Sequence, residues 1–211
     1  MMRPLILVGG GGHCKSVIEA AESANFIIKG ILALPSELGK KTLGYDVIGN
    51  DSDISQYVDE CDFVVTLGFI KNPALRNKLH MCIENAGGKL ATVIASTAYV
   101  SKHATIGVGT VVLHGAVINA GAQIGKGCII NTLSNIEHDA VIGDYCHIST
   151  GVMVNGDCKV GDNTFLGSQS VMVNATSIPA NSVFAAGCMI RKSQKVEGVY
   201  AGNPAVLMKK K

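Results

Sequence analysis

The chain has 211 residues, of which 47% are hydrophobic and 16% charged, and its formal net charge is only +2. Such a balanced charge argues against nucleic acid or a membrane surface as a partner. A short apolar run at residues 4–8 leads directly into glycines, which is typical of a strand rather than of a signal peptide or a membrane span, so we expect a cytoplasmic protein. The 7 Cys have no CxxC spacing and suit a reduced compartment.

Strand-like and helix-like segments alternate over the first part of the chain. We expect strands at residues 4–8, 26–34, 45–48, 62–67 and 89–94, and helices at 15–22, 51–58 and 72–85, the last opening with Pro73 in its first turn. Alternation of this kind predicts a small α/β domain, Rossmann-like, with a parallel sheet.

Ligands of such domains bind beyond the carboxyl ends of the strands. That rule selects seven candidate substrate-binding residues: Gly11, Gly12, His13, Cys14, Ala33, Leu34 and Gly68. The glycine loop before a helix favours phosphate, although glycines can also serve only tight turns. Two departures from the dinucleotide fingerprint argue against NAD, because Cys14 replaces its third glycine and Ala33-Leu34 lacks its acidic residue.

An apolar residue recurs at every sixth position from Ile94 to Ile190 without interruption. The series is Ile94, Val100, Ile106, Val112, Ile118, Ile124, Ile130, Ile136, Ile142, Ile148, Val154, Val160, Leu166, Met172, Ile178, Phe184 and Ile190. Two residues before each member lies a second series that is small at every position except Val152, and it includes Cys128, Cys146, Cys158 and Cys188. A strict period of six residues matches neither the 3.6-residue period of a helix nor the two-residue period of an ordinary strand, and it predicts a parallel β-helix.

The repeat divides the chain into three parts. We expect an α/β ligand-binding domain at 1–92, a β-helix domain at 93–195, and a capping loop and tail at 196–211. The four Cys of the small series are then packing residues rather than metal ligands.

His138 follows Ile136 by two positions and should point outward from the prism, between Glu137 and Asp139. Flanking carboxylates stabilise an imidazolium, which suits a general base, but a surface histidine without a role fits the spacing equally well. His147 lies nine residues on, half of an 18-residue coil, so the two histidines should face different sides of the prism. That separation argues against a zinc site, and we expect no metal.

The chain resembles the sialic acid O-acyltransferase (NeuD-type) family of hexapeptide-repeat acyltransferases, which have a left-handed parallel β-helix. This family includes the bacterial nucleotide 4-amino-sugar N-acetyltransferases of the bacillosamine pathway. The motifs that carry the resemblance are the run Gly9 to Val17, Leu67-Gly-Phe69 before a helix with Arg76, the run Ile130 to Asp139, Asn155-Gly156-Asp157, and Gly202 to Ala205. Some members carry an acidic pair after the second strand, where this chain has Ala33-Leu34.

The resemblance implies an acetyl-CoA-dependent acetyltransferase that forms a homotrimer, with active sites between subunits. It implies three catalytic residues: His138 as general base, Asp139 beside it, and Gly156, whose backbone N–H meets the thioester oxygen. One coil separates Gly156 from His138, so the two should stack. The implied coenzyme-binding residues are His147, Ser168, Ala186 and Gly187, while the α/β domain binds the sugar nucleotide.

Two enzymatic functions remain open at this point. One is N-acetylation of a nucleotide-linked 4-amino-4,6-dideoxy sugar by direct transfer to the amine. The other is O-acetylation of a sialic or related nonulosonic acid, which calls for a cation near the substrate carboxylate, such as Lys15 or Lys71. A non-enzymatic scaffold and a metal-dependent hydratase are the weaker alternatives.

Overall fold

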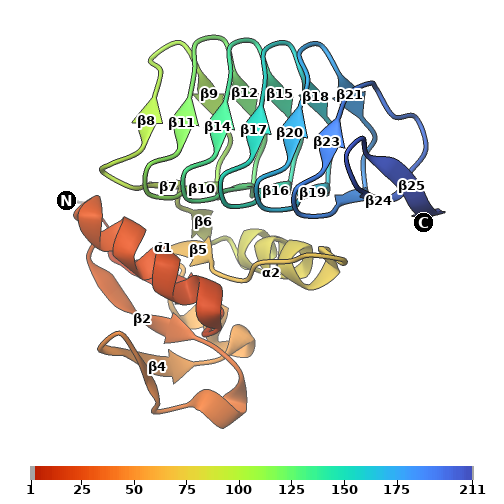
Figure 1. The fold of residues 1–211 in the computed structure, drawn as a ribbon. Coiled ribbons are helices and arrows are strands. Elements are labelled where there is room, and N and C mark those ends of the chain that lie inside the picture. Colours follow the sequence, from red (N-terminus) through yellow and green to blue (C-terminus); the bar gives the residue numbers. More distant parts are fainter. Residues whose placement is uncertain (1–2, 211) are drawn as a thin grey trace.

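The computed structural model describes residues 3–210 and consists of an α/β domain followed by a three-sided prism of parallel strands (Figure 1). The prism is the expected left-handed β-helix of hexapeptide repeats. No helix among the described residues is long and apolar enough to cross a membrane.

The α/β domain is built on one six-stranded sheet with the strand order β3-β4-β2-β1-β5-β6. The strands are β1 (Leu5–Val8), β2 (Ile28–Leu32), β3 (Lys41–Thr42), β4 (Tyr45–Gly49), β5 (Asp62–Val65) and β6 (Lys89–Leu90). All neighbours are parallel except β3 and β4. Strand β1 lies in the centre and is buried throughout, as expected for an apolar strand covered on both faces.

Four helices surround this sheet: α1 (Gly12–Ser23), η1 (Pro35–Glu37), η2 (Asp51–Gln56) and α2 (Ala74–Asn85), of which η1 and η2 are 3₁₀-helices. Alternate residues of β1 face opposite sides. Leu5 and Leu7 pack with α1, whereas Ile6 and Val8 pack with η2 and α2.

Seventeen two-residue strands form the prism, and the second residue of each is a member of the six-residue apolar series. They are β7 (Val93–Ile94), β8 (Tyr99–Val100), β9 (Thr105–Ile106), β10 (Val111–Val112), β11 (Val117–Ile118), β12 (Gln123–Ile124), β13 (Ile129–Ile130), β14 (Asn135–Ile136), β15 (Val141–Ile142), β16 (His147–Ile148), β17 (Met153–Val154), β18 (Lys159–Val160), β19 (Phe165–Leu166), β20 (Val171–Met172), β21 (Ser177–Ile178), β22 (Val183–Phe184) and β23 (Met189–Ile190).

Every third strand joins the same sheet, so one coil takes 18 residues. We call the sheets first (from β7 to β22), second (from β8 to β23) and third (from β9 to β21). The apolar series fills the interior together with the small series, in which Cys128, Cys146, Cys158 and Cys188 are buried. The interpretation of these thiols as packing residues is therefore confirmed.

Several local predictions differ from the structure. The segment 89–94 is not one strand, because β6 belongs to the α/β sheet and β7 starts the prism. Strand β3 and helix η1 were not expected, and the helix expected at 51–58 is the 3₁₀-helix η2, which ends at Gln56. The segment 196–211, expected as a loop and tail, contains β24 (Gly198–Ala201) and β25 (Val206–Lys210). Its last residue lies outside the described part of the chain.

The α/β domain packs directly on the first sheet of the prism. Helix α1 shares a buried apolar cluster with Val93, Val111 and Leu113. On α2, the buried Arg76 guanidinium donates to the carbonyls of Val65 and Leu67 in its own domain and of Gly127 in the prism. This shared core and the three carbonyls bound by one cation hold the two parts together.

Candidate functional site

The glycine loop ends at an uncapped helix N-terminus. Gly11 is the N-cap of α1, no side chain caps the helix, and its first turn has no acidic residue. A Cβ at Gly11 or Gly12 would meet nothing within 4 Å, so the loop borders open space. Exposed N–H groups at the positive end of a helix dipole attract an anion such as phosphate.

Beside this loop lies a cavity of about 280 Å³, which we call the glycine-loop pocket. It is bounded by Gly9, Gly10, Gly11, Ala33, Leu34, Glu37, Asp51, Leu67, Leu75 and Leu79. Three of the expected substrate residues, Gly11, Ala33 and Leu34, therefore line one pocket. Its walls are mostly apolar with two carboxylates, and no Lys or Arg is among these lining residues.

His13 and His147 approach each other where the α/β domain meets the prism, with ring centroids 6.2 Å apart. Gly68 lies between them, because a Cβ on it would be 3.7 Å from His147 Cε1 and 3.9 Å from His13 Cβ. Burial, with Arg76 nearby, lowers the pKa of His13 to about 3. Its Nε2 is buried and has no hydrogen-bond partner among the described residues, so this ring nitrogen is unsatisfied in the single chain.

His147 is held in one orientation and one tautomer. Its Nδ1 donates to the Phe69 carbonyl at 2.8 Å, and Asn131 Nδ2 lies 3.3 Å from its Nε2. The ring also contacts Phe69 and Phe165 edge-on. Burial lowers the pKa of His147 to about 4, which keeps it neutral near pH 7. Since both nitrogens are engaged, His147 is a binding or packing residue rather than a base.

A cavity of about 530 Å³ runs from His147 along the first sheet, and we call it the prism groove. Its lining is Ile70, Lys71, His147, Ser149, Phe165, Gly167, Ser168, Val183, Ala185, Ala186 and Val199. Three expected coenzyme residues, His147, Ser168 and Ala186, are brought together here. Gly187 follows Ala186 in the chain and donates its N–H to the Ser168 carbonyl.

The prism groove adjoins a second cavity of about 580 Å³ that shares Lys71, Val183 and Val199 with it. Lys209 and Lys210 of β25 complete the lining of this second cavity. An elongated ligand can therefore extend from an apolar, His147-containing end to an end lined by three lysines.

His138 lies on a turn after β14, on the edge between the second and third sheets. Its side chain is 59% exposed, and its Nδ1 donates to Asp139 Oδ2 at 2.9 Å. That hydrogen bond raises the pKa of His138, with smaller contributions from the charges of Asp139, Asp157 and Glu137. With Nδ1 committed to Asp139, Nε2 remains as the basic nitrogen.

Gly156 stacks against His138 as expected. A Cβ at this position would lie 2.6 Å from His138 Nε2 and 2.7 Å from Cε1, so only glycine leaves room for the imidazole. Gly121 has the same relation to Asp139, whose Oδ1 would be 2.3 Å from an added Cβ. Two glycines one coil away on either side thus allow the His138–Asp139 pair to lie flat on the edge of the prism.

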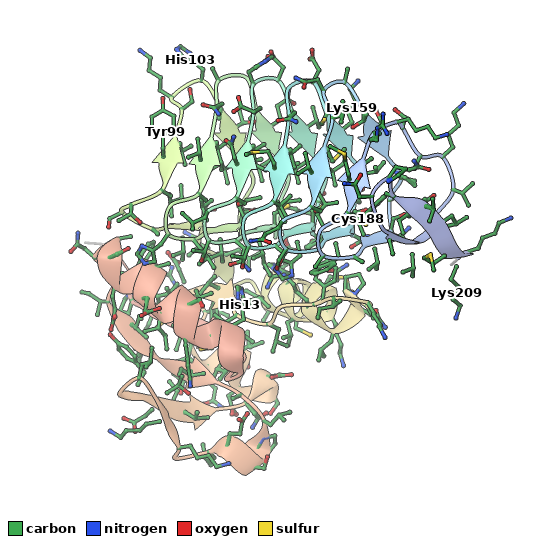
Figure 2. The ribbon with its side chains drawn as sticks, in the orientation of Figure 1. His13, Tyr99, His103, Lys159, Cys188 and Lys209 are labelled. Carbon is green, nitrogen blue, oxygen red and sulfur yellow. The ribbon has the colours of Figure 1, made fainter. Side chains whose placement is uncertain are left out.

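The edge that carries His138 is remote from the prism groove within one chain. The groove follows the first sheet, where the α/β domain packs, while His138 lies on the edge opposite that sheet. Figure 2 marks the contrast, with His13 at the domain junction and His103 on the far edge. His103 and His138 both follow strands of the second sheet, β8 and β14. The expected separation of His138 from His147 is therefore observed.

Cys14 does not line the pocket with its side chain. It belongs to the buried face of α1, and burial raises the pKa of its thiol to about 11. Gly12 and His13 do not line the glycine-loop pocket either, because they form the first turn of α1 directly after the loop. Phe165 and Glu37 are site residues that sequence reasoning missed. Phe165 follows His147 by one coil, so extending the 18-residue count outward from His147 identifies it.

No group of three or more His, Cys, Asp or Glu able to hold a metal ion is found within residues 3–210.

Comparisons with known proteins bear on both halves of the chain. Residues 4–83 match the model of the PglD N-terminal domain, and residues 121–156 and 139–174 match that of the bacterial transferase hexapeptide (six repeats). No curated protein matches in sequence.

Solved structures match over the whole chain. The acetyltransferase domain of PglB from Neisseria gonorrhoeae, in complex with acetyl coenzyme A, is 28% identical with a TM-score of 0.91, covering 99% of this chain and 100% of that one. A histidine-to-asparagine variant of perosamine N-acetyltransferase from Caulobacter crescentus, in complex with CoA and GDP-perosamine, is 27% identical with a TM-score of 0.91, covering 98% and 97%. WeeI from Acinetobacter baumannii is 22% identical, with a TM-score of 0.86 and coverage of 97% and 99%, and supports the fold alone.

These matches confirm the predicted fold and the predicted enzyme class, an acetyltransferase with hexapeptide repeats. The matched N-terminal model is that of PglD, so the finer assignment to the NeuD type is not what the comparisons single out.

Proposed function

We propose that this protein is an acetyl-CoA-dependent N-acetyltransferase that acts on a nucleotide-linked 4-amino-4,6-dideoxy sugar. The observation that carries the proposal is a pair of cavities linked by the segment 67–70: Leu67 lines the cavity beside the glycine loop, and Ile70 lines the cavity along the prism, together with His147. A transfer between two large substrates needs two such cavities opening near one point. The PglB and perosamine relatives, crystallised with acetyl-CoA and with CoA plus GDP-perosamine, support this assignment.

Each substrate has a place in this arrangement. The diphosphate lies at the N-terminus of α1, the nucleoside enters the glycine-loop pocket, and the amino sugar extends towards His13 and Gly68. Acetyl-CoA lies along the prism groove, with Ser168, Ala186 and Gly187 beside its pantetheine arm. Its phosphates lie towards Lys209 and Lys210, because the lysine ammonium groups attract the anionic phosphates of the coenzyme.

The chemical step is direct transfer with His138 as general base. The amine nitrogen attacks the thioester carbonyl carbon, and His138 Nε2 takes the amine proton. The C–S bond then breaks, and the coenzyme sulfur takes that proton from the His138 imidazolium, so the coenzyme leaves as its thiol. Asp139 fixes the tautomer and stabilises the imidazolium, and the backbone N–H of Gly156 faces the developing oxyanion. A covalent Cys intermediate is not needed, and six of the 7 thiols are buried.

Because His138 is remote from the prism groove of its own chain, the proposed site needs residues from two subunits. In the proposed homotrimer, the His138 edge of one protomer faces the prism groove of the next. The second sheet, which adjoins both edges, supports this packing, because its outward residues are mostly apolar: Tyr99, Val117, Asn135, Met153, Val171 and Met189. Tyr99 is 58% exposed and Met153 40% exposed in the single chain.

O-acetylation of a sialic or related acid is the alternative, and the glycine-loop pocket argues against it. A sugar carboxylate calls for a cation, whereas this pocket presents Glu37 and Asp51. Lys71 lies on the prism groove instead.

A thiol-release assay with acetyl-CoA tests the proposal. The acceptors are UDP- and GDP-linked 4-amino-4,6-dideoxy sugars, their 4-hydroxy counterparts, and free sialic acids, with mass spectrometry of the product. We expect release only with the amino sugars and a product that carries one acetyl amide. Release with sialic acid alone, or with no acceptor of this panel, would reject the proposal.

A further inference from the structure

The glycine-loop pocket contains a carboxylate that the sequence did not reveal. In dinucleotide-binding folds, an acidic residue at the end of the second strand holds the ribose hydroxyls. Strand β2 ends here at Leu32 and is followed by Ala33 and Leu34, so that acid is missing from its usual place. Helix η1 turns the chain back immediately afterwards, and its last residue is Glu37.

Glu37 occupies the space beside the glycine loop. Its Oε2 would be 3.5 Å from a Cβ placed on Gly10, and it accepts a hydrogen bond from Leu34 N at 3.3 Å. Both Glu37 and Gly10 line the same pocket. A carboxylate has about four lone-pair sites, so one long bond to Leu34 leaves acceptor capacity for further donors.

We propose that Glu37 binds the ribose 2′- and 3′-hydroxyls of the nucleotide substrate, and thereby replaces the absent acid at the end of β2. This proposal rests on the nucleotide-sugar function proposed above and names the residue that recognises the nucleoside.

The position of Glu37 favours ribose over the other parts of a nucleotide. A carboxylate repels phosphate, and the phosphates have their own site at the uncapped N-terminus of α1. Ribose is bonded directly to the α-phosphate, so it lies one group away from the glycine loop, where Glu37 is found. The base then reaches the apolar part of the pocket, lined by Leu34, Leu75 and Leu79.

Calorimetric binding of nucleoside diphosphates to the full chain tests this role without requiring turnover. The probes are UDP and GDP, each paired with its 2′-deoxy form. For the nucleotide that binds, we expect the wild type to prefer the ribose form by roughly 10- to 100-fold, the effect of one hydrogen bond to a charged group. Glu37→Ala should bind both forms with the same reduced affinity.

Two further variants separate recognition from folding. Glu37→Gln keeps one acceptor oxygen, which Leu34 N and the ribose would have to share, so we expect an intermediate preference. Glu19→Gln removes an exposed carboxylate of α1 outside the pocket and should behave as wild type. In turnover assays, Glu37→Ala should raise the KM for the nucleotide sugar and leave the KM for acetyl-CoA unchanged, a split that general loss of structure would not produce.

The outcomes distinguish the two proposals. A wild-type protein that binds ribose and deoxyribose forms equally, or a Glu37→Ala variant that keeps the full preference, overturns the role of Glu37 while the nucleotide site stands. A protein that binds neither UDP nor GDP overturns the nucleotide-sugar function and the role of Glu37 with it.

Discussion

Replacing Gly156 with alanine tests the geometry of the proposed base most sharply, because the substitution adds one methyl group next to His138. That methyl would lie 2.6 Å from Nε2 and 2.7 Å from Cε1 of the imidazole, whereas ordinary carbon contacts are about 3.5 Å or longer. The ring must therefore move by about 1 Å. A displacement of that size in a reacting group costs about 10²-fold in rate.

The fold should tolerate this change. Gly156 is absent from the residues with positive φ, so alanine can adopt its backbone conformation without strain. His138 is 59% exposed, and its ring can swing towards solvent instead of displacing the prism backbone. We expect the free energy of unfolding to change by less than about 1 kcal/mol, measured by urea denaturation.

The assay is thiol release from acetyl-CoA under saturating amino sugar, for Gly156→Ala, His138→Ala and the double variant. We expect kcat to fall about 10²-fold in Gly156→Ala, with little further loss when His138 is already absent, because both changes remove the same function. Wild-type turnover in Gly156→Ala would refute the stacking argument. Additive losses in the double variant would show that Gly156 acts independently of His138.

Three other predictions address electrostatics and stability. Asp139 raises the pKa of His138, and a base must be neutral to act, so Asp139→Asn should move the acidic limb of the kcat/KM profile to lower pH; an unmoved limb would contradict this. Burial lowers the pKa of His80, a residue of α2, to about 3 and that of His147 to about 4, below the unfolded value near 6.5, so the unfolded chain takes up more protons as pH falls. Between pH 7 and pH 5, each should therefore cost about 2 kcal/mol of unfolding free energy, and denaturation curves that coincide at the two pH values would contradict it. Arg76→Met leaves three carbonyls without their donor and should destabilise the protein by about 3 kcal/mol in urea unfolding, with a loss below 1 kcal/mol arguing against the domain contact.

The sequence was sufficient for the prism and for much of its outer surface. A six-residue period fixes which residues fill the interior, and an 18-residue coil fixes which residues stack, so the positions of His138 beside Gly156 and across from His147 follow by counting. The same count groups Ser168 with Ala186. Each coil repeats the preceding one, so residues 18 positions apart in the chain lie next to each other. This is why a single sequence was enough to predict these contacts.

Contacts between the α/β domain and the prism could not be counted in this way. The bond from His147 to the Phe69 carbonyl joins residues 78 positions apart, and no periodicity links them. Glu37 was missed because a short 3₁₀-helix, set by Pro35, brings it back over Gly10. The side chain of Cys14 was assigned to the substrate loop, but the helix begins at Gly12 and turns that thiol into the core.

Subunit complementation tests the central claim, a site shared between protomers with His138 on one side and the prism groove on the other. The two partners are His138→Ala, which lacks the base, and Ala186→Trp, which fills the groove at an exposed lining residue. Each variant alone should be nearly inactive. After co-expression in equal amounts, random assembly of a trimer gives about a quarter of the sites an intact base facing an intact groove, so we expect about 25% of wild-type acetyl transfer. Activity that stays at the level of the separate variants would show that both halves of the site belong to one chain.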